Sequence, residues 1–173
     1  GVLASLGGID PAAITAAPEG DAWWIVMRDA TDDLLDDTSP LEREDLLRQA
    51  GMEFRDVVRT WIHLREMDRD YADLNRARRE FFRARGIDPV PASTGIGGGL
   101  VSEGHDLCLG VYAVKAGRPL VRTVMTSPTL NEAVQYGADF VRGMKMVETN
   151  KVALHVSGTA SIDEHGTTVH IGD

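Results

Sequence analysis

The sequence is poor in cysteine and has no long apolar run. Its 173 residues include one cysteine, Cys108, which excludes a disulfide within the chain and favours a reducing compartment. No stretch reaches the roughly 20 consecutive apolar residues that a membrane-spanning helix needs. The N-terminus also lacks the basic-then-apolar layout of a signal peptide. The composition therefore predicts a soluble, cytoplasmic protein with no membrane partner.

Positive charge is scarce as well. The chain has 18 Lys and Arg against 27 Asp and Glu, a formal net charge of -9. Broad nucleic-acid binding needs a basic surface to meet the phosphate backbone, so we expect no nucleic-acid partner. A small anionic ligand is not excluded, because two or three local arginines are enough to bind it.

Four segments have the composition or alternation of β-strands. They are residues 22–30, 56–64, 105–117 and 119–127. Residues 128–149 are expected to be irregular or weakly helical. The closing stretch returns to strand, and we expect a hairpin with His165 and Gly166 in its turn.

Two helices are expected between these strands. The first covers 40–50, with Ser39 as its cap and Gly51 as its C-terminal stop. The second covers 70–85 and carries an apolar stripe. This order of elements predicts an α/β (α+β) domain, a mixed β-sheet with both helices packed on one face.

The densest glycine cluster is Thr94 to Gly99. It matches neither the dinucleotide-binding pattern nor the P-loop pattern, although such glycines could present backbone N–H groups to an anion. The more frequent alternative is a flexible turn before a strand. We therefore expect residues 92–99 to form a turn-rich loop.

Histidine and cysteine give weak signals for a metal or a nucleophile. His155, His165 and His170 lie in or near the closing hairpin, but a zinc site needs three or four converging ligands. Cys108 lies within an alternating strand, where a buried structural cysteine is the common case. We expect no metal.

Arginine gives a better indication of binding. The helix arginines are expected to face solvent: Arg76, Arg78, Arg79 and Arg83. Four others lie in strands or beside glycines, where a guanidinium can bind a carboxylate by two parallel hydrogen bonds: Arg59, Arg118, Arg122 and Arg142. The alternative for Arg142 is a surface ion pair with Asp139 or Glu148.

Several segments resemble the Rid (YjgF-like) family. Residues 51–82 look like the middle of that family, and Pro91-Ala92-Ser93 stands where the family has Pro-Ala-Arg. Closer similarities are to the chorismatases, which combine two Rid-like halves in one chain. The shared motifs are R-x-W-x-x-L from Arg59, Y-x-x-L-N from Tyr71, PA-x-TGIG from Pro91, YG followed by F-x-R from Tyr136, and VSGTASI from Val156.

This resemblance implies a Rid/chorismate-mutase-like sheet and a division of the chain. Residues 1–130 would be a Rid-like domain, 131–150 a connector, and 151–173 the first hairpin of a second, incomplete Rid-like half. Hairpin strands with unpaired edges tend to recruit another chain. We therefore expect a homo-oligomer, a trimer by family resemblance, or a completing second polypeptide.

The resemblance also implies a chemistry. Chorismatases release pyruvate from chorismate, a small anionic carboxylate, and no cofactor is expected. Their proton-donating Glu comes late in the second half, and no residue here matches it. The substrate-binding positions implied by the resemblance are Tyr71, Thr94, Gly95, Tyr136, Arg142, Gly158, Thr159 and Ala160. Two alternatives are a Rid-type imine deaminase, which Ser93 in place of the family's Arg disfavours, and a non-catalytic ligand-binding protein.

Overall fold

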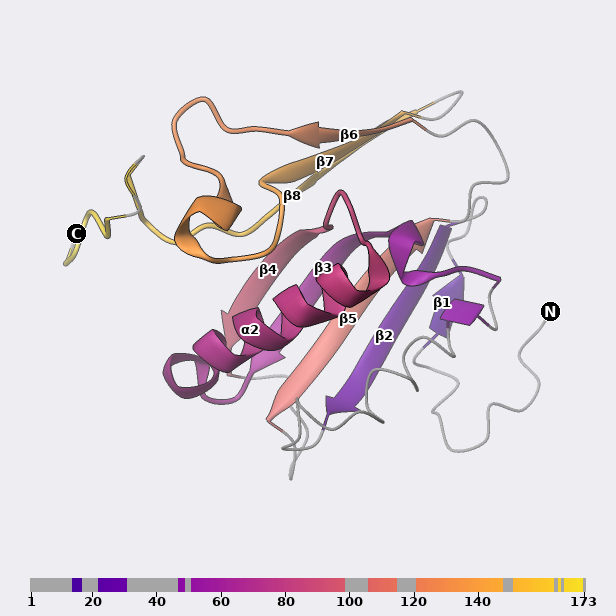
Figure 1. Ribbon diagram of the computed structural model, residues 1–173, viewed down its shortest axis with the longest axis horizontal. Helices are drawn as coiled ribbons and strands as arrows, with labels where there is room; N and C mark the ends of the chain where they lie inside the picture. Colours follow the sequence, from indigo (N-terminus) through magenta and orange to yellow (C-terminus); the bar gives the residue numbers. More distant parts are fainter. Residues whose placement is uncertain are drawn as a thin grey trace.

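The computed structural model contains two β-sheets and one long helix (Figure 1). It describes residues 14–16, 22–30, 47–48, 51–98, 106–114, 121–147, 151–163, 165 and 167–172, and of the first two ranges the backbone alone. Within these residues, no helix has both the length and the apolar character required to cross a membrane.

The larger sheet has five strands in the order β1-β2-β5-β3-β4. Their bounds are β1 Ile14–Ala16, β2 Ala22–Ala30, β3 Val57–Leu64, β4 Ala92–Gly97 and β5 Leu107–Val114. Only β3 and β4 pair in parallel, and the other neighbours are antiparallel. The predicted mixed sheet is confirmed, and so are its strands at 22–30, 56–64 and 105–117.

Strand β4 corrects the expectation for the glycine cluster. Residues 92–97 are not a loop, because every residue from Ala92 to Gly97 has a register partner on β3. A tertiary hydrogen-bonding partner here overrides the low strand propensity of glycine. The turn begins only at Gly98, which has φ 76° and donates its N–H to the carbonyl of Leu64 at 2.7 Å.

Helix α2, Met67–Arg85, lies across the five-stranded sheet (Figure 1). It begins three residues before the predicted start and ends as predicted at Gly86, whose φ is 59°. Acidic residues in its first turn and arginines in its last turn complement the helix dipole. Its buried Leu74 packs against Ile62 and Leu64 of β3, so the helix covers one face of the sheet.

The first predicted helix is described only at its C-terminal end. Leu47 and Arg48 are helical, and Gly51 follows with φ 69°. Gly51 donates its N–H to Arg48 at 2.8 Å, and Met52 donates to Leu47 at 2.7 Å, as at a glycine-terminated helix. The remainder of 40–50 lies outside the described residues, so the packing of this helix on the sheet stays a prediction.

The smaller sheet has three antiparallel strands in the order β6-β7-β8: Val121–Met125, Gly143–Val147 and Val152–Val156. The strand predicted at 119–127 is confirmed as β6. The expectation that 128–149 is irregular or weakly helical holds for the 3-10 turn Ala133–Tyr136 but is wrong for β7. In β7 the buried Met144 and Met146 alternate with the exposed Lys145, which is the pattern of a strand. The signal is weak because β-branched residues are rare in this segment.

The closing hairpin differs from the expected one. Strand β8 pairs with β7, and the residues after the turn do not extend it. The turn itself is present: Ile162 and Thr168 form an isolated antiparallel bridge, and the Asp163 carboxylate accepts the N–H of His165 and of Thr167, each at 2.9 Å. The division at 130 and 150 stays a prediction.

A hydrophobic core joins the two sheets. Tyr112 and Val114 of β5 pack with Met144 and Met146 of β7, whereas Leu107 of the same strand belongs to the cluster under α2. Side chains of a strand alternate between its faces. The small sheet and α2 therefore cover opposite faces of the large sheet.

The outer face of β8 has no such cover among the residues that the structure describes. Val152, Leu154 and Val156 are 62%, 54% and 62% exposed, and β8 is an edge strand. Edge strands with apolar side chains pair readily with other chains. This surface agrees with the predicted oligomer or second polypeptide, which stays a prediction.

We expect Met146→Ala to lower the free energy of unfolding by about 2–5 kcal/mol, because Met146 is 0% exposed between the sheets. Urea unfolding measures the change. Val121→Ala on the same small sheet is the control, since Val121 is 59% exposed and its truncation should cost about 0.5 kcal/mol or less. Equal costs for the two variants would contradict the packing of the small sheet on the large one.

Candidate functional site

The outer edge of β4, the last strand of the large sheet, is hydrogen-bonded to the segment that follows β8. The N–H of Ser93 donates to the hydroxyl of Ser157 at 2.8 Å, and that hydroxyl donates to the carbonyl of Val141. The N–H of Gly158 points at two acceptors, the carbonyl of Ser93 at 3.2 Å and the hydroxyl of Thr94 at 2.9 Å. Ser93 and Ser157, which are 64 positions apart in the sequence, thus lie side by side.

Gly158 is required by this close approach. A Cβ at this position would lie 2.5 Å from Cγ2 of Thr94 and 3.0 Å from its Oγ1. No side chain fits there without moving β4 or the segment. The glycine therefore fixes the depth at which the Ser157–Thr159 segment sits against the sheet.

Arg142 is buried beside this junction, with 6% exposure. Its Nε and Nη2 donate to the carbonyl of Asn131 at 2.9 and 2.7 Å, and Nη1 donates to the hydroxyl of Thr159 at 3.2 Å. The guanidinium carbon lies 5.3 Å from the ring centre of Tyr136 and 5.8 Å from that of Phe140. The side chain is held by neutral groups on several sides.

No acid neutralises Arg142 within the described part of the chain. Asp139, one of the two surface partners considered, pairs instead with Arg79 at 3.0 Å. The ion pair between Arg142 and Asp139 is therefore a wrong expectation, and Glu148 lies outside the described residues. The Tyr136 phenol also hydrogen-bonds Arg142, so the groups that hold this guanidinium, the Asn131 carbonyl, the Thr159 hydroxyl and the phenol, carry no negative charge.

Arg78 is a second cation at the same place. It donates to Oδ1 of Asn75 at 2.6 Å and to the hydroxyl of Ser93 at 3.4 Å, and its guanidinium lies 5.6 Å from the ring centre of Phe140. Its Nε is buried without a partner, and burial lowers the pKa of the guanidinium. The expectation that Arg78 faces solvent is wrong, because this side of α2 faces the β4 edge.

Two tyrosines border the arginines. Tyr71 and Tyr136 are 37% and 41% exposed, so their rings lie at the rim of the cluster. Burial raises the pKa of the Tyr136 phenol above its ordinary value, and the positive charge of Arg142 opposes that rise. Both phenols interact electrostatically with Arg78. The cluster thus combines two guanidinium groups with two phenols and the hydroxyl of Ser93.

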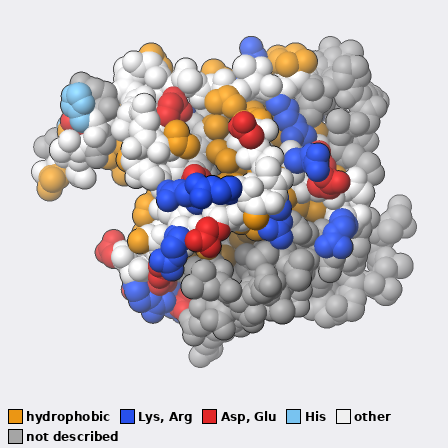
Figure 2. All heavy atoms as spheres, viewed as in Figure 1, with side chains coloured by type: hydrophobic (Ala, Val, Ile, Leu, Met, Phe, Trp, Pro, Cys, Tyr) orange, Lys and Arg blue, Asp and Glu red, His pale blue; other side chains and the backbone are white. Residues whose placement is uncertain are grey.

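Arginine in this setting is unlike arginine elsewhere on the surface. Figure 2 shows the blue side chains of this face interspersed with red ones. The ion pairs of Arg69 with Asp70 and of Arg76 with Asp73, at 2.6 and 2.8 Å, are examples on α2. A cation that has no carboxylate beside it is the one available to an external anion.

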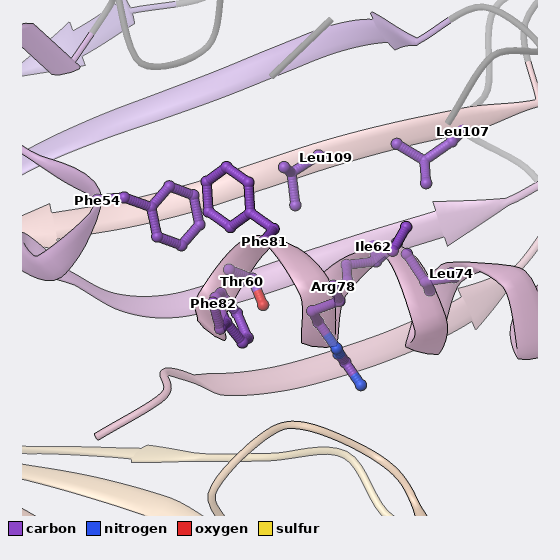
Figure 3. Close-up of a pocket in the computed structure, with 10 residues that line it drawn as sticks. Phe54, Thr60, Ile62, Leu74, Arg78, Phe81, Phe82, Leu107 and Leu109 are labelled. Atoms are coloured by element: carbon purple, nitrogen blue, oxygen red, sulfur yellow. The ribbon is translucent and has the colours of Figure 1, made fainter. Parts of the chain in front are cut away.

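Two cavities adjoin the arginines. One of about 210 Å³ lies beside Arg142 and is lined by Met125, Ser127, Leu130, Leu154 and Thr159, among others. The other, of about 110 Å³, is an apolar space under α2, lined by Phe54, Ile62, Leu74, Phe81 and Leu109, among others. Figure 3 shows the guanidinium end of Arg78 turned away from Phe81 and Leu109. Arg78 therefore covers the apolar space with its stem and presents its charge elsewhere.

The structure brings most of the predicted site residues together. Tyr71 lies against Gly95, Thr94 against Gly158, and Arg142 against Tyr136 and Thr159. Ala160 is exposed next to Thr159 in the chain. Thr94 and Gly95 are consecutive on a strand, so the side chain of Thr94 and the Tyr71 ring that lies against Gly95 are on opposite faces of the sheet. The eight residues therefore surround the β4 edge and do not form a single wall.

The other candidate arginines have different surroundings. Arg122 donates to the carbonyls of Arg55 and Val114, at 2.6 and 3.0 Å, and lies 3.6 Å from Asp56, so it ties β6 to the large sheet. Arg59 is buried on the face opposite α2, with 6% exposure. Arg118 lies outside the described residues.

Sequence reasoning missed Arg78 and the hydroxyl of Ser93. The signal was present in the helical spacing of Tyr71, Asn75 and Arg78, which places all three on one side of α2. It was hidden because Arg76, Arg79 and Arg83 are interleaved with Arg78 and made the whole run look like a solvated basic face.

Histidine and cysteine take no part in this cluster. Cys108 is buried in β5, as expected. His155 faces the interior from β8, where its ring lies 5.0 Å from that of Tyr112, whereas His170 is exposed and bonds Ser161 at 3.1 Å. Within the described ranges, no three His, Cys, Asp or Glu residues are grouped so that they could hold a metal ion.

Comparison with solved structures shows what the fold resembles. A chorismatase of known crystal structure superposes with a TM-score of 0.68 and 27% sequence identity, over 96% of this chain and 53% of that one. The chain has a chorismatase-like fold. It spans about half of the length, 53%, of the chorismatase that it matches.

Smaller Rid proteins share the fold of this chorismatase-like chain. The YjgF gene product of E. coli matches 65% of the chain with a TM-score of 0.51 and 16% identity, over 91% of its own length. E. coli TdcF, solved with bound serine, matches 65% of the chain with a TM-score of 0.51 and 14% identity, over 91% of its own length. No family model and no curated protein matches the chain.

We expect Gly158→Ala to destabilise the chorismatase-like chain by about 1–3 kcal/mol, because the added methyl group would overlap Thr94. Thr94→Ser removes Cγ2, the atom nearest to that methyl group. The double variant should therefore recover about 0.5 kcal/mol or more relative to the sum of the single variants in urea unfolding.

Gly110→Ala is the matched control, since its Cβ would lie no closer than 3.7 Å to Trp61. A cost for Gly158→Ala no larger than for Gly110→Ala, or strict additivity with Thr94→Ser, would contradict the close contact between Gly158 and β4.

Proposed function

We propose that this chain provides the carboxylate-binding part of a chorismatase-type active site, which removes pyruvate from chorismate or a related enolpyruvyl carboxylate. The observation that carries the proposal is the pair of arginines at the β4 edge, the half-buried Arg78 and the buried Arg142, neither of which has a carboxylate within ion-pair distance among the described residues. The similarity to a chorismatase over 96% of the chain supports the same reading.

Electrostatics favour an anionic ligand at this place. The chain has a net charge of -9, so the field of the whole protein repels anions and an anionic ligand needs a local cation. A guanidinium binds a carboxylate through parallel N–H groups of fixed geometry. Arg142 is held by neutral groups of Asn131 and Thr159, which orient the guanidinium without cancelling its charge. Arg78 supplies the second charge that a dicarboxylate requires.

The proposed chemistry is hydrolysis of an enol ether. A carboxylic acid protonates the terminal carbon of the enolpyruvyl group, which forms an oxocarbenium ion. Water adds to the cationic carbon and loses a proton to the carboxylate, which gives a hemiketal. The bond between that carbon and the ether oxygen then breaks, the oxygen stays on the ring as a hydroxyl group, and pyruvate leaves. Such an acid needs a raised pKa in order to hold its proton near neutrality. In the proposal the acid comes from outside the residues described, since none of them corresponds to the family's late Glu.

The deaminase alternative has less support. In that reaction the family's Arg in the Pro-Ala-Arg segment binds the substrate carboxylate, and Ser93 stands in its place. The Ser93 hydroxyl is already occupied, because it accepts from Thr60 at 2.8 Å and from Arg78 at 3.4 Å. The third alternative, a non-catalytic binding protein, differs from the proposal in releasing no pyruvate.

A completing polypeptide belongs to the same proposal. The cavity beside Arg142 is lined by Leu154 and Val156, which also form the exposed apolar face of β8. A second chain or a further part of the natural protein that covers β8 would therefore also close this cavity and could bring the missing acid.

We expect Arg142→Lys and Arg78→Met each to weaken chorismate binding at least tenfold, about 1.4 kcal/mol, in calorimetric titrations of the natural full-length protein. Lysine keeps the charge but lacks the planar set of donors, and methionine keeps an apolar stem without the charge. Truncation of Arg142 to alanine is a poorer test, because it also removes the hydrogen bonds to Asn131 and lowers stability.

Arg76→Met is the control on the same helix, because the Arg76 side chain is 53% exposed and paired with Asp73. It should leave the affinity unchanged. Equal affinities for all variants would overturn the assignment of these two arginines. Absence of chorismate binding and of pyruvate release by the unmutated protein would overturn the chorismatase-type function.

A further inference from the structure

A further arginine, Arg59, is buried on the opposite face of the large sheet from Arg78. Arg59 on β3 is 6% exposed, and its guanidinium lies 5.0 Å from the ring centre of Trp61. Nη2 donates to the hydroxyl of Thr94. Nη1 is buried and has no hydrogen-bond partner. Nη2 of this guanidinium is therefore held by Thr94, whereas Nη1 lacks a hydrogen-bond acceptor.

The surroundings of Arg59 are apolar. The core between the two sheets is formed there by Val58, Ala92, Tyr112, Met144 and Met146. Among the residues that the structure describes, no carboxylate pairs with Arg59. Burial lowers the pKa of the guanidinium, yet arginine remains protonated in proteins. A buried charge of this kind is costly unless an opposite charge or a hydrogen-bond acceptor accompanies it.

A second buried nitrogen without a hydrogen-bond partner lies between the same two sheets. His155 on β8 faces the large sheet, and its ring lies 5.0 Å from that of Tyr112, the cross-strand neighbour of Arg59. Its Nε2 is buried without a partner. Burial, and secondly the charge of Arg59, lower the pKa of His155, so the imidazole is neutral near pH 7 and can donate one N–H.

We propose that a small monovalent anion, chloride or the carboxylate of a small acid, binds between Nη1 of Arg59 and Nε2 of His155. Such an anion accepts an N–H from each side chain and neutralises the guanidinium. A bound water can accept the same hydrogen bonds but leaves the charge uncompensated. The two donors come from β3 and β8, strands of two sheets that pack against each other.

This anion site is separate from the pair of arginines at the β4 edge. Ser93, which bonds Arg78, and Thr94, which bonds Arg59, are consecutive residues of β4 and point to opposite faces. The two sites are nevertheless connected through Thr94, because its hydroxyl accepts from Arg59 and from the N–H of Gly158. An anion that fixes Arg59 therefore also fixes the segment that carries Thr159.

Thermal unfolding tests the proposal. Sodium chloride and sodium formate are titrated separately at constant ionic strength, with sodium gluconate, whose anion is too bulky for the site, as the balancing salt. We expect the melting temperature of the unmutated protein to rise saturably with at least one of the two anions. The two titrations distinguish a halide from a carboxylate as the preferred occupant. A binder of the native state alone produces such a saturable shift.

The variants separate site binding from general salt effects. Arg59→Met keeps an apolar stem against Trp61 and should abolish the saturable rise, whereas His155→Phe keeps a ring on Tyr112 and should raise the midpoint concentration about tenfold or more. Arg76→Met, an exposed surface variant, should retain the full response. An identical response in Arg59→Met and the unmutated protein, or no response in the latter, would overturn the site.

A crystal grown in sodium bromide provides the second measurement. We expect an anomalous peak within hydrogen-bonding distance of both Arg59 and His155. Water alone at this position, or a carboxylate side chain of the protein itself, would overturn the proposal even if the melting temperature responds to salt. Neither result bears on chorismate binding, so this proposal and the proposed function can fail independently.

Discussion

The junction between the free edge of β4 and the Ser157–Thr159 segment is the contact on which the rest of the site depends. Ser157 fills the position of a neighbouring strand, since it bonds both Ser93 and Val141, and Gly158 allows the approach because any side chain there would overlap Thr94. This junction sets Thr159 against Arg142 and keeps the small sheet over Arg59. The site thus follows from backbone hydrogen bonds before any charged group is considered.

Three arginines lie around this junction, and none of them forms an ion pair with a carboxylate of the described residues. The net charge of the chain is nevertheless negative. Neutral groups hold them instead: the carbonyl of Asn131, the amide of Asn75 and the hydroxyl of Thr94 position the guanidinium groups of Arg142, Arg78 and Arg59 in turn. Neutral acceptors orient a cation without cancelling its charge. The chain thereby retains electrostatic attraction for anions at a few interior points, while surface arginines such as Arg69 and Arg76 are paired with acids.

Much of the fold could be predicted from the sequence, because β3, β5, β6 and α2 have regular patterns and α2 ends at a glycine. Two strands could not. Gly95 and Gly97 of β4 made a local turn more plausible than a strand, since parallel pairing with β3 is a long-range effect. Val147 is the only β-branched residue among the 5 residues of β7, so the sequence of β7 gives a weak strand signal. The family resemblance identified Arg142 and Gly158, but Arg78 was overlooked because burial of one arginine among several depends on how α2 meets β4.

Thr94 has a consequence for how this sequence can change over time. Its one hydroxyl accepts hydrogen bonds from Arg59 on one face and from the Gly158 backbone at the edge, while its methyl group leaves no room for a larger residue at 158. A mutation at 94 alone would disturb both of the proposed anion sites at once. Descendants of this sequence should therefore keep positions 59, 94 and 158 together or replace them together, and divergence of ligand preference should begin at positions outside this trio.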